Sequence, residues 1–254
     1  MGFSMKRWVG KVAIVTGASS GCGAAAVKRL LEENLIVVGI ARRKDRVKAL
    51  SESKNLHALQ ADVTKEEELL EAFKWVKENL GPIHILLNCA GILRLTNYLD
   101  GETKFWREMM ETNYLGLCIA TREAVKDMRA NNVDGHIIHI NDIGGYKLLG
   151  IENTNACCAS KYSVTAALEG LRVELCGIKS KIKVSSINPG YVKTEILDAC
   201  IKVQPEMKEF LENAVAGLEP LSAEDITDMF IFLLSTAPHV QVHELTVRPV
   251  GEEL

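Results

Sequence analysis

The sequence of 254 residues predicts a doubly wound α/β fold with seven parallel strands in one sheet. Short apolar runs rich in β-branched residues alternate with longer amphipathic segments along the whole chain, which is typical of repeated βα units. A glycine-rich turn at residues 16–23 follows the first apolar run and opens the first amphipathic segment. No Pro/Gly/Ser-rich linker and no repeat at a solenoid period divide the chain, so we expect one domain over residues 1–254.

Each expected strand is a short apolar run that a parallel sheet would bury on both faces. The seven are 11–16, 35–40, 56–59, 83–88, 136–141, 183–187 and 245–247. The expected helices alternate with them: 23–33, 65–79, 103–131, 156–176 and 223–234, with a shorter, less regular one across 205–218. Residues 191–221 have the weakest strand or helix signal, which predicts a lid over a substrate site.

Composition and charge exclude several classes of protein. Hydrophobic residues make up 47% of the chain and charged residues 25%, which is typical of a globular domain and not of a disordered chain. Lys and Arg number 30 against 33 Asp and Glu, giving a net charge of -3. The chain lacks the basic excess of a nucleic-acid-binding protein, so we expect no nucleic acid partner.

The cysteines and the apolar runs indicate a cytoplasmic protein. The seven cysteines are scattered, with no C-x-x-C pair and no Cys/His spacing of a zinc site, so we expect reduced thiols and no metal. The most apolar run, 35–41, is less than half as long as a membrane span requires. The first residues contain no apolar targeting segment. We therefore expect no membrane partner.

The turn TGASSGCG predicts a dinucleotide site. Its glycines stand where the backbone must turn tightly and approach a pyrophosphate, and the following helix would present free N–H groups to the phosphates. The alternative is an ordinary tight βα turn with incidental glycines. The candidate contacts in this turn are Gly17, Ser19, Ser20, Gly21, Cys22 and Gly23.

Three motifs together resemble the classical short-chain dehydrogenase/reductase family. They are TGASSGCG, NCAG at 88–91, and the pair PG at 189–190 followed by Thr194. The resemblance covers nearly the whole chain and implies a Rossmann-type fold and hydride-transfer chemistry. Within the family the chain is similar to the dehydrogenase/reductase member-11-like and farnesol-dehydrogenase-like group, through GHII at 135–138, KYSVTA at 161–166 and RP at 248–249.

The end of the second strand predicts the cofactor. An acidic residue there would bind a ribose 2′-OH, whereas an arginine neutralises a 2′-phosphate. The chain has Arg42 and Arg43, so we expect NADP(H), with Arg42 as the main contact and Arg43 as a second. The alternative is a solvated basic turn.

The resemblance implies further cofactor contacts along the chain. Asp62 is one of them, although it also fits the N-cap region of the helix beginning near residue 65. The full set is Asp62, Val63, Asn88, Ala90, Gly91, Lys161, Pro189, Gly190, Val192 and Thr194.

The expected catalytic residues depart from the family pattern at two of four positions. The family places a tyrosine four residues before the lysine, on one helix face, and here that position is Cys157 before Lys161. The family serine after the fifth strand is Asp142. Asn113 matches the remaining member of the tetrad.

Both replacements oppose ordinary carbonyl reduction. A cysteine sulfur stops several ångström short of a tyrosine hydroxyl, and about 1 Å of misplacement can cost on the order of 100-fold in rate. An ionised Asp142 about 4 Å from a developing oxyanion would oppose it by roughly 4 kcal/mol at an effective dielectric of ~20. We expect impaired catalysis.

Several alternatives stay open for these positions. Three groups could replace the missing catalytic ones. Cys157 could act as a thiolate stabilised by Lys161, Asp142 could be kept protonated by burial and donate a hydrogen bond, or the Tyr146 phenol could move in from its loop. In the simplest alternative Cys157 and Cys158 are small helix residues, and Asp142 only pairs with Lys161.

Two hypotheses of function follow. The first is an NADP(H)-dependent oxidoreductase for hydrophobic alcohols, aldehydes or ketones, with a noncanonical acid/base formed by Asp142, Cys157 and Lys161. The second is a pseudoenzyme that binds cofactor and a lipophilic ligand without ordinary turnover; non-redox chemistry has no support beyond the presence of these groups. The apolar residues of the lid fit a lipophilic ligand, or else helix packing or a subunit interface. The resemblance implies a homodimer or homotetramer.

Overall fold

The computed structural model describes residues 3–217 and 219–252. Four parts of the sequence-based predictions lie partly outside these residues. Residues 1–2, at the start of the expected domain and of the stretch searched for a targeting segment, lie outside. So do residues 253–254, at the end of the expected domain. Residue 218, in the expected lid and at the end of the expected helix 205–218, lies outside as well.

A seven-stranded sheet, parallel at every pairing, forms the centre of the molecule, which confirms the predicted fold class. Its strand order is β3-β2-β1-β4-β5-β6-β7. The strands are β1 (Val12–Thr16), β2 (Ile36–Ala41), β3 (Leu56–Gln60), β4 (Ile83–Asn88), β5 (His136–Ile140), β6 (Lys183–Pro189) and β7 (Glu244–Val247). Each lies within two residues of its predicted bounds.

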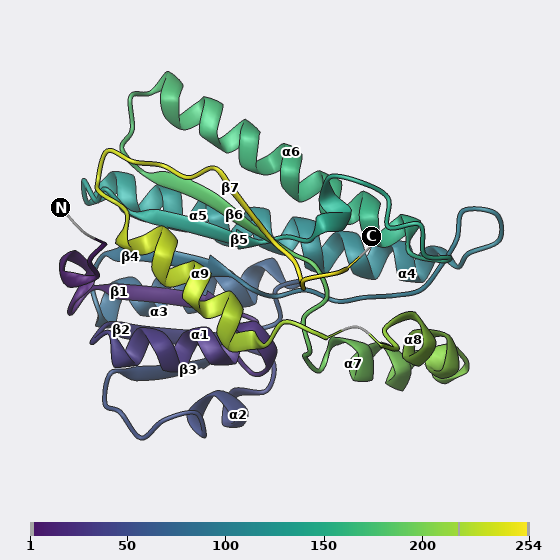
Figure 1. Cartoon of the computed structure of the whole chain (residues 1–254). Helices are drawn as coiled ribbons and strands as arrows, with labels where there is room; N and C mark the ends of the chain where they lie inside the picture. The colour runs from purple at the N-terminus through teal and green to yellow at the C-terminus, as the bar shows by residue number, and fades with distance from the viewer. Residues whose placement is uncertain (1–2, 218, 253–254) are drawn as a thin grey trace.

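Helices cover both faces of the sheet (Figure 1). One face packs against α3 (Glu66–Asn79), α5 (Gly116–Ala130) and α6 (Asn155–Gly177). The other face packs against α1 (Gly21–Glu32), α2 (Lys44–Lys48) and α9 (Ala223–Ser235). The capping box between Ser222 and Asp225 fixes the start of α9, because each side chain bonds to the other residue's backbone N–H.

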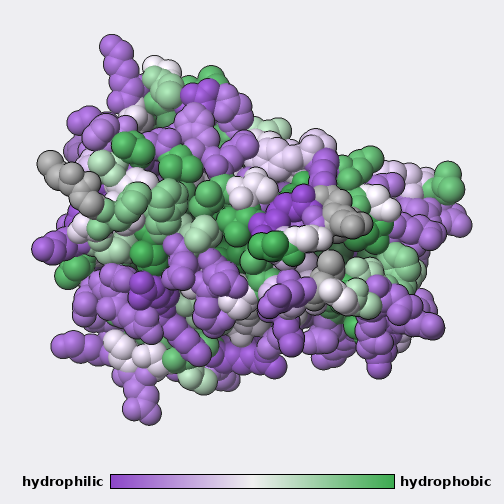
Figure 2. Space-filling view, in the orientation of Figure 1, coloured by the Kyte–Doolittle hydropathy of each residue, from purple (hydrophilic) through white to green (hydrophobic). Residues whose placement is uncertain are grey.

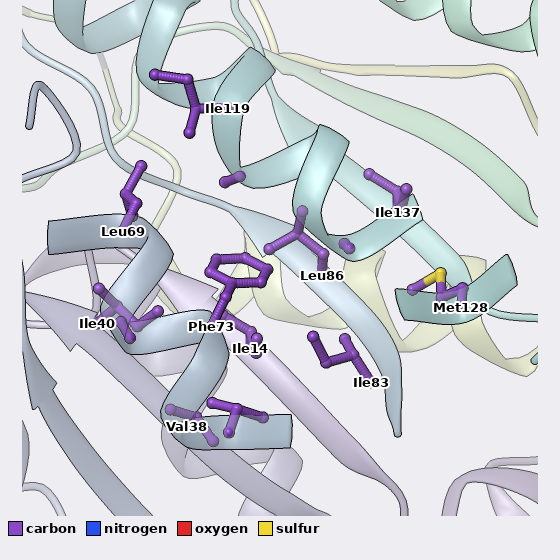
Figure 3. Close-up of a cluster of buried hydrophobic side chains, with 14 of the residues drawn as sticks. Ile14, Val38, Ile40, Leu69, Phe73, Ile83, Leu86, Ile119, Met128 and Ile137 are labelled. Atoms are coloured by element: carbon purple, nitrogen blue, oxygen red, sulfur yellow. The ribbon is translucent and has the colours of Figure 1, made fainter. Parts of the chain in front are cut away.

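One of the two cores that cover the sheet lies between α3, α5 and the sheet (Figure 3). Phe73 points from α3 toward Ile14 of β1 and Leu86 of β4, and all three side chains are fully buried. Truncating a buried phenylalanine to alanine typically costs about 3–5 kcal/mol. This core therefore fixes the position of the central strands, whose carboxyl ends carry the expected site.

Two predicted helices differ from the structure. The expected helix 103–131 is divided into α4 (Thr103–Met109), a π-helical segment (Met110–Leu115) and α5. The apolar spacing is that of a continuous helix, and a single wide turn barely changes it.

The expected helix 205–218 is instead a 3₁₀ turn (Pro205–Met207) followed by the short helix α8 (Lys208–Ala214). A further helix that the sequence did not predict, α7 (Ile196–Val203), precedes them, and Pro205 prevents it from continuing because proline is not tolerated in a helix interior. Within the described ranges, no helix is long and apolar enough to cross a membrane.

Candidate cofactor and catalytic site

The expected site residues gather where four neighbouring strands end. The glycine-rich turn follows β1, the segment 88–91 begins at the end of β4, Asp142 follows β5, and Pro189 ends β6. The strand order reverses between β1 and β4, and the crevice at such a switch point is where doubly wound sheets bind ligands. The helices α7 and α8 lie beyond this edge (Figure 1).

The glycine-rich turn contains positions that only glycine fits. Gly17 has φ 65°, and a Cβ there would lie 2.7 Å from the Ala90 backbone. A Cβ on Gly23 would lie 2.5 Å from the Gly17 carbonyl oxygen. The Thr16 hydroxyl ties this turn to the neighbouring strand end, since it accepts hydrogen bonds from the backbone N–H groups of Cys89 (3.2 Å) and Ala90 (3.3 Å).

The remaining residues of the glycine-rich turn connect it to α1 and to the segment after β6. Ser20 is the N-cap of α1 in extended conformation. Gly21 has φ 53°, and a Cβ there would lie 3.2 Å from the Thr194 side chain. Burial raises the pKa of Cys22 to about 11, so this thiol stays protonated. Gly21 and Thr194 thus join the turn to the segment after β6.

Of the two arginines after β2, the structure gives Arg43 the contacts with the turn. Its Nε and Nη2 each donate to the Ser19 hydroxyl at 3.2 Å, and Nη2 donates to the Ser20 hydroxyl at 2.9 Å. Arg42 is exposed. The sequence ranked Arg42 first, because it cannot show which guanidinium turns toward the glycine-rich loop.

Three of the expected cofactor contacts, Asp62, Val63 and Asn88, are held in place by contacts within the protein. Asp62 Oδ1 accepts from the backbone N–H and the hydroxyl of Thr64, at 3.0 and 2.9 Å, which agrees with the alternative that it supports the chain entering α3. Val63 packs against Gly116 of α5, where a Cβ would come 2.6 Å from the Val63 carbonyl oxygen. Asn88 is buried and donates to the Thr121 hydroxyl at 3.0 Å.

Asn113 lies in the π-helical segment between α4 and α5 and holds the loop after β4. Its Oδ1 accepts from the Ile92 N–H at 2.8 Å, while its Nδ2 donates to the Ile92 carbonyl oxygen and to the Ser160 hydroxyl, both at 3.0 Å. Gly91 adjoins this amide, since a Cβ there would lie 3.6 Å from it. The wide turn lets the Asn113 side chain reach both partners, a frequent use of π-turns at functional sites.

Lys161 and Asp142 lie near enough for the lysine charge to lower the pKa of the carboxyl, but no direct ion pair joins them among the described residues. Lys161 Nζ donates to the carbonyl oxygens of Asn141 (3.2 Å) and Ile140 (3.4 Å). The Asp142 carboxylate accepts from the Gly144 N–H at 2.6 Å. Within the described residues no ion pair of 4.0 Å or less joins Asp142 to Lys161, so the interpretation in which they simply pair is wrong.

Burial dominates the electrostatics of the two replaced positions. It raises the pKa of Asp142, and the Lys161 charge partly offsets this. Burial raises the pKa of Cys157 to about 12; the nearby Asp142 carboxyl raises it further, and Lys161 lowers it. Cys157 is therefore a protonated thiol at neutral pH, which gives no support to the thiolate alternative.

The other candidate hydroxyls do not face Lys161. The Tyr146 hydroxyl is buried beside the hydroxyls of Ser186 and Thr165, which lower its pKa against the larger effect of burial. Tyr162 is 43% exposed on the outer side of α6. Neither tyrosine replaces the missing phenol in this conformation.

The two ends of the segment 191–221 lie side by side. Its first residues pair with its last, through the bridge between Val192 and Leu221. In its middle, the buried Gln204 side chain bonds to the backbone of Leu95, accepting from the N–H at 2.9 Å and donating to the carbonyl oxygen at 2.7 Å. An apolar cluster surrounds this contact: Leu95, Cys200 and Leu211, with Leu93, Leu197, Ile201, Met207 and Phe210 packed against it.

Sequence reasoning missed several polar residues that shape this edge. Ser160 binds Asn113, Gln204 binds Leu95, Glu195 binds two arginines, and Glu252 accepts from the Tyr191 N–H at 2.9 Å. Their partners are distant in the sequence, so no local pattern marks them. Only Ser160 had a signal, since it directly precedes Lys161.

The fold and this edge define a doubly wound α/β protein of the dinucleotide-binding type. A family model described as short chain dehydrogenase matches residues 11–204. The chain belongs to the short-chain dehydrogenase/reductase family, as the motifs predicted.

Its relatives include both groups that the sequence resembles. Farnesol dehydrogenase of Aedes aegypti is 45% identical, over 98% of this chain and 100% of the relative. Dehydrogenase/reductase SDR family member 11 of Bos taurus is 38% identical, over 98% and 99%.

Solved structures with the same fold contain NADP. The closed form of serine dehydrogenase complexed with NADP+ has a TM-score of 0.84 at 26% identity, covering 93% of this chain and 94% of that chain. ElxO with NADP bound has a TM-score of 0.79 at 25% identity, covering 94% and 98%.

Proposed function

We propose that this chain binds NADP(H) at the edge formed by β1, β2, β4 and β6. A 2′-phosphate fits the donor set formed by Arg42, Arg43 and the hydroxyls of Ser19 and Ser20. No acidic residue stands between the end of β2 and Asp45 to bind a 2′-OH instead. The bare backbone of Gly17 and the free amino end of α1 fit a pyrophosphate. When bound, the cofactor supplies or accepts a hydride.

We propose further that ordinary hydride-transfer catalysis is impaired. The observation that carries this proposal is the pair of groups at the catalytic positions: a Cys157 thiol with its pKa near 12 and the buried Asp142 carboxyl. A thiol is shorter than a phenol and does not reach the same substrate oxygen. Asn113 and Lys161 keep their places, but the proton donor and the carbonyl-orienting hydroxyl are both absent.

The ligand of this site is proposed to be a lipophilic alcohol, aldehyde or ketone. The first relative described above is named for farnesol, a hydrophobic alcohol. The segment 191–221 acts as the lid, because its apolar cluster lies against the loop after β4 beside the catalytic edge. Such a lining favours a ligand with a long hydrocarbon part.

The second candidate function is an active oxidoreductase with a noncanonical acid/base. The observation that favours it is the raised pKa of Asp142, because a buried carboxyl near Lys161 can hold a proton and release it. In this case Asp142 moves the proton, Lys161 sets its pKa, and Cys157 borders the pocket.

We propose a cytoplasmic homodimer or homotetramer built from one domain. Exposed apolar side chains on the π-helical segment and on α6, which contact each other, fit a subunit interface: Met110 (39%), Leu115 (49%), Tyr162 (43%) and Val173 (54%). Figure 2 shows a second gathering of hydrophobic residues over β7 and α9. Light scattering during gel filtration tests the oligomeric state.

One preparation tests the two candidate functions together. NADPH and NADH are titrated by calorimetry, and turnover is measured with farnesol, farnesal and a panel of lipophilic ketones. Tighter binding of NADPH with no turnover above the cofactor-only background supports the impaired enzyme. Turnover that Asp142→Asn abolishes supports the noncanonical acid/base instead.

A further inference from the structure

Glu195 links the lid to the arginines of the expected 2′-phosphate site. It directly precedes α7, the first helix of the lid. Its Oε2 accepts from Arg43 Nη1 at 3.2 Å and from Arg46 Nη1 at 2.8 Å, and its Oε1 accepts from Arg46 Nη1 at 3.0 Å. One carboxylate therefore neutralises part of the positive charge after β2.

Arg43 divides its donors between this carboxylate and the glycine-rich turn. Its Nε and Nη2 donate to the hydroxyls of Ser19 and Ser20, while its Nη1 faces Glu195. The side chains of Arg43, Arg46 and Glu195 are 48%, 52% and 50% exposed, so an anion arriving from solvent reaches them without unfolding any element.

We infer that Glu195 competes with the 2′-phosphate for Arg43 and thereby sets how strongly this chain prefers the phosphorylated cofactor. The inference rests on the proposed NADP(H) site and adds a residue that opposes it. A 2′-phosphate itself carries nearly two negative charges, so it attracts the Arg43 guanidinium more strongly than the single charge of the Glu195 carboxylate does. Arg43 Nη1 then turns to the phosphate, while Arg46 keeps Glu195 through its two contacts.

Arg46 lowers the free-energy cost of moving Arg43 from Glu195 to the phosphate. Its Nη1 contacts both Glu195 oxygens, so Glu195 keeps a partner when Arg43 leaves. The exchange is also coupled to the lid, because Glu195 loses one of its two arginines at the start of α7. Phosphate binding therefore weakens the contact between Arg43 and Glu195 at the start of α7. Because such coupling is reciprocal, removing this contact in advance should strengthen phosphate binding.

The experiment titrates 2′,5′-ADP and 5′-AMP into the full chain by calorimetry. Glu195→Gln removes the charge and keeps the shape; we expect it to tighten 2′,5′-ADP binding about two- to fivefold, as for an exposed ion pair, and to change 5′-AMP binding by less than about 1.5-fold. Glu206→Gln, at an exposed lid glutamate, is the matched control and leaves both affinities unchanged. The gain from Glu195→Gln shrinks at 0.5 M salt.

A double-mutant cycle separates competition from a general loss of charge. Arg46→Gln weakens 2′,5′-ADP binding, because Glu195 then depends on Arg43 alone, and most of this loss disappears when Glu195→Gln is also present. Hydrogen exchange adds a second readout: 2′,5′-ADP, but not 5′-AMP, speeds amide exchange in residues 195–203 of the wild type.

The outcomes distinguish this inference from the proposed cofactor. Unchanged or weaker 2′,5′-ADP binding by Glu195→Gln overturns the competition, as does an Arg46→Gln loss of equal size with and without Glu195. Wild-type protein that binds 2′,5′-ADP no better than 5′-AMP overturns the NADP(H) site itself.

Discussion

Lys161 Nζ donates to the Asn141 carbonyl oxygen at 3.2 Å, which ties the second turn of α6 to the residue that follows β5. The ammonium is thus held beside Asp142 and Cys157 and lowers the pKa of both, against the larger effect of burial. An ammonium has three donors, so the group keeps capacity for a ribose or a water while it is anchored. Lys161, the expected relay lysine, is therefore anchored, while Cys157 occupies the position where the family has its tyrosine.

The first prediction concerns the reactivity of Cys157. With a pKa near 12, roughly one molecule in ten thousand carries the thiolate at pH 8, and only the thiolate is alkylated. We expect iodoacetamide to modify the exposed Cys176 first and to leave Cys157 unmodified in native protein, as measured by peptide mass spectrometry. Lys161→Gln slows Cys157 further. Rapid labelling of Cys157 at pH 7 would contradict the burial argument.

The second prediction concerns stability in mild acid. Burial lowers the pKa of His139 to about 4, from about 6.5 in the unfolded chain. Between these values the unfolded state binds a proton that the folded state does not, so the free energy of unfolding falls as pH decreases from 6.5 to 4. For His139 alone the loss reaches about 3 kcal/mol at pH 4. Urea denaturation at several pH values measures it.

A variant isolates this contribution from other titrating groups. His139→Asn keeps an acceptor near the position of Nδ1, which lies 3.1 Å from Asn88 Nδ2, and removes the proton site. We expect a shallower pH dependence in this variant and none of that change in His243→Gln, at an exposed position. Because Asp142 titrates in both proteins, the comparison cancels its effect. Identical slopes in the two variants would exclude His139 as the cause.

The sequence predicted the sheet well because each strand is a local signal. A run such as 83–88 is mostly apolar on both faces and stands between Gly81-Pro82 and the glycine of the NCAG motif, and its bounds are those of β4. The family resemblance located Cys157 and Lys161 four residues apart, and both lie on α6 as that spacing predicted. The motifs lie at strand ends, so the topology that orders the strands also brings the motifs together.

Contacts between residues that are far apart in the chain could not be predicted from the sequence. The Glu195 pairs join exposed charges about 150 residues apart, and any of several acids would have suited the arginines. Gln204 resembles an ordinary surface residue, yet it is 2% exposed and satisfies the Leu95 backbone. Short helices such as α2 and α7 have too few turns for a clear apolar period.

The third prediction concerns the carboxyl-terminal Glu252. Its side chain is 1% exposed, accepts from Arg248 Nε at 2.7 Å and from the Tyr191 N–H at 2.9 Å, and fills the space beside Gly190. It therefore fixes the start of the segment 191–221. Glu252→Gln should lower stability by about 1–3 kcal/mol, because a buried charged hydrogen bond is lost, and should speed amide exchange at Tyr191.

Two comparisons test whether Glu252 acts through this contact. Arg248→Gln should give a similar loss, and the double variant should lose less than the sum of the two single variants. Glu206→Gln should leave stability and Tyr191 exchange unchanged. Additive losses, or a Tyr191 amide that exchanges as in the wild type, would mean that Glu252 does not position the lid.

The last prediction is that the two departures from the family pattern can be repaired together. Asp142→Ser with Cys157→Tyr should raise NADPH-dependent reduction of lipophilic ketones at least about 100-fold, within the range that a positioned proton donor contributes. The donor and the orienting hydroxyl act as a unit, so each single variant should do much less. Asp142→Ser alone lacks a donor of sufficient reach, and Cys157→Tyr alone places its phenol beside a carboxyl that raises the phenol pKa.

The controls decide whether the repaired pair itself does the chemistry. The rate of the double variant should depend on pH through the new phenol and should vanish with Asp142→Ser and Cys157→Phe, which fills the same space without a hydroxyl. Tyr162→Phe in the repaired protein should change nothing, because Tyr162 lies one residue from Lys161 and points about 100° away on the helix. If the wild type already reduces these ketones and the double variant loses that activity, Asp142 and Cys157 are the working acid/base, and the impaired-enzyme proposal is wrong.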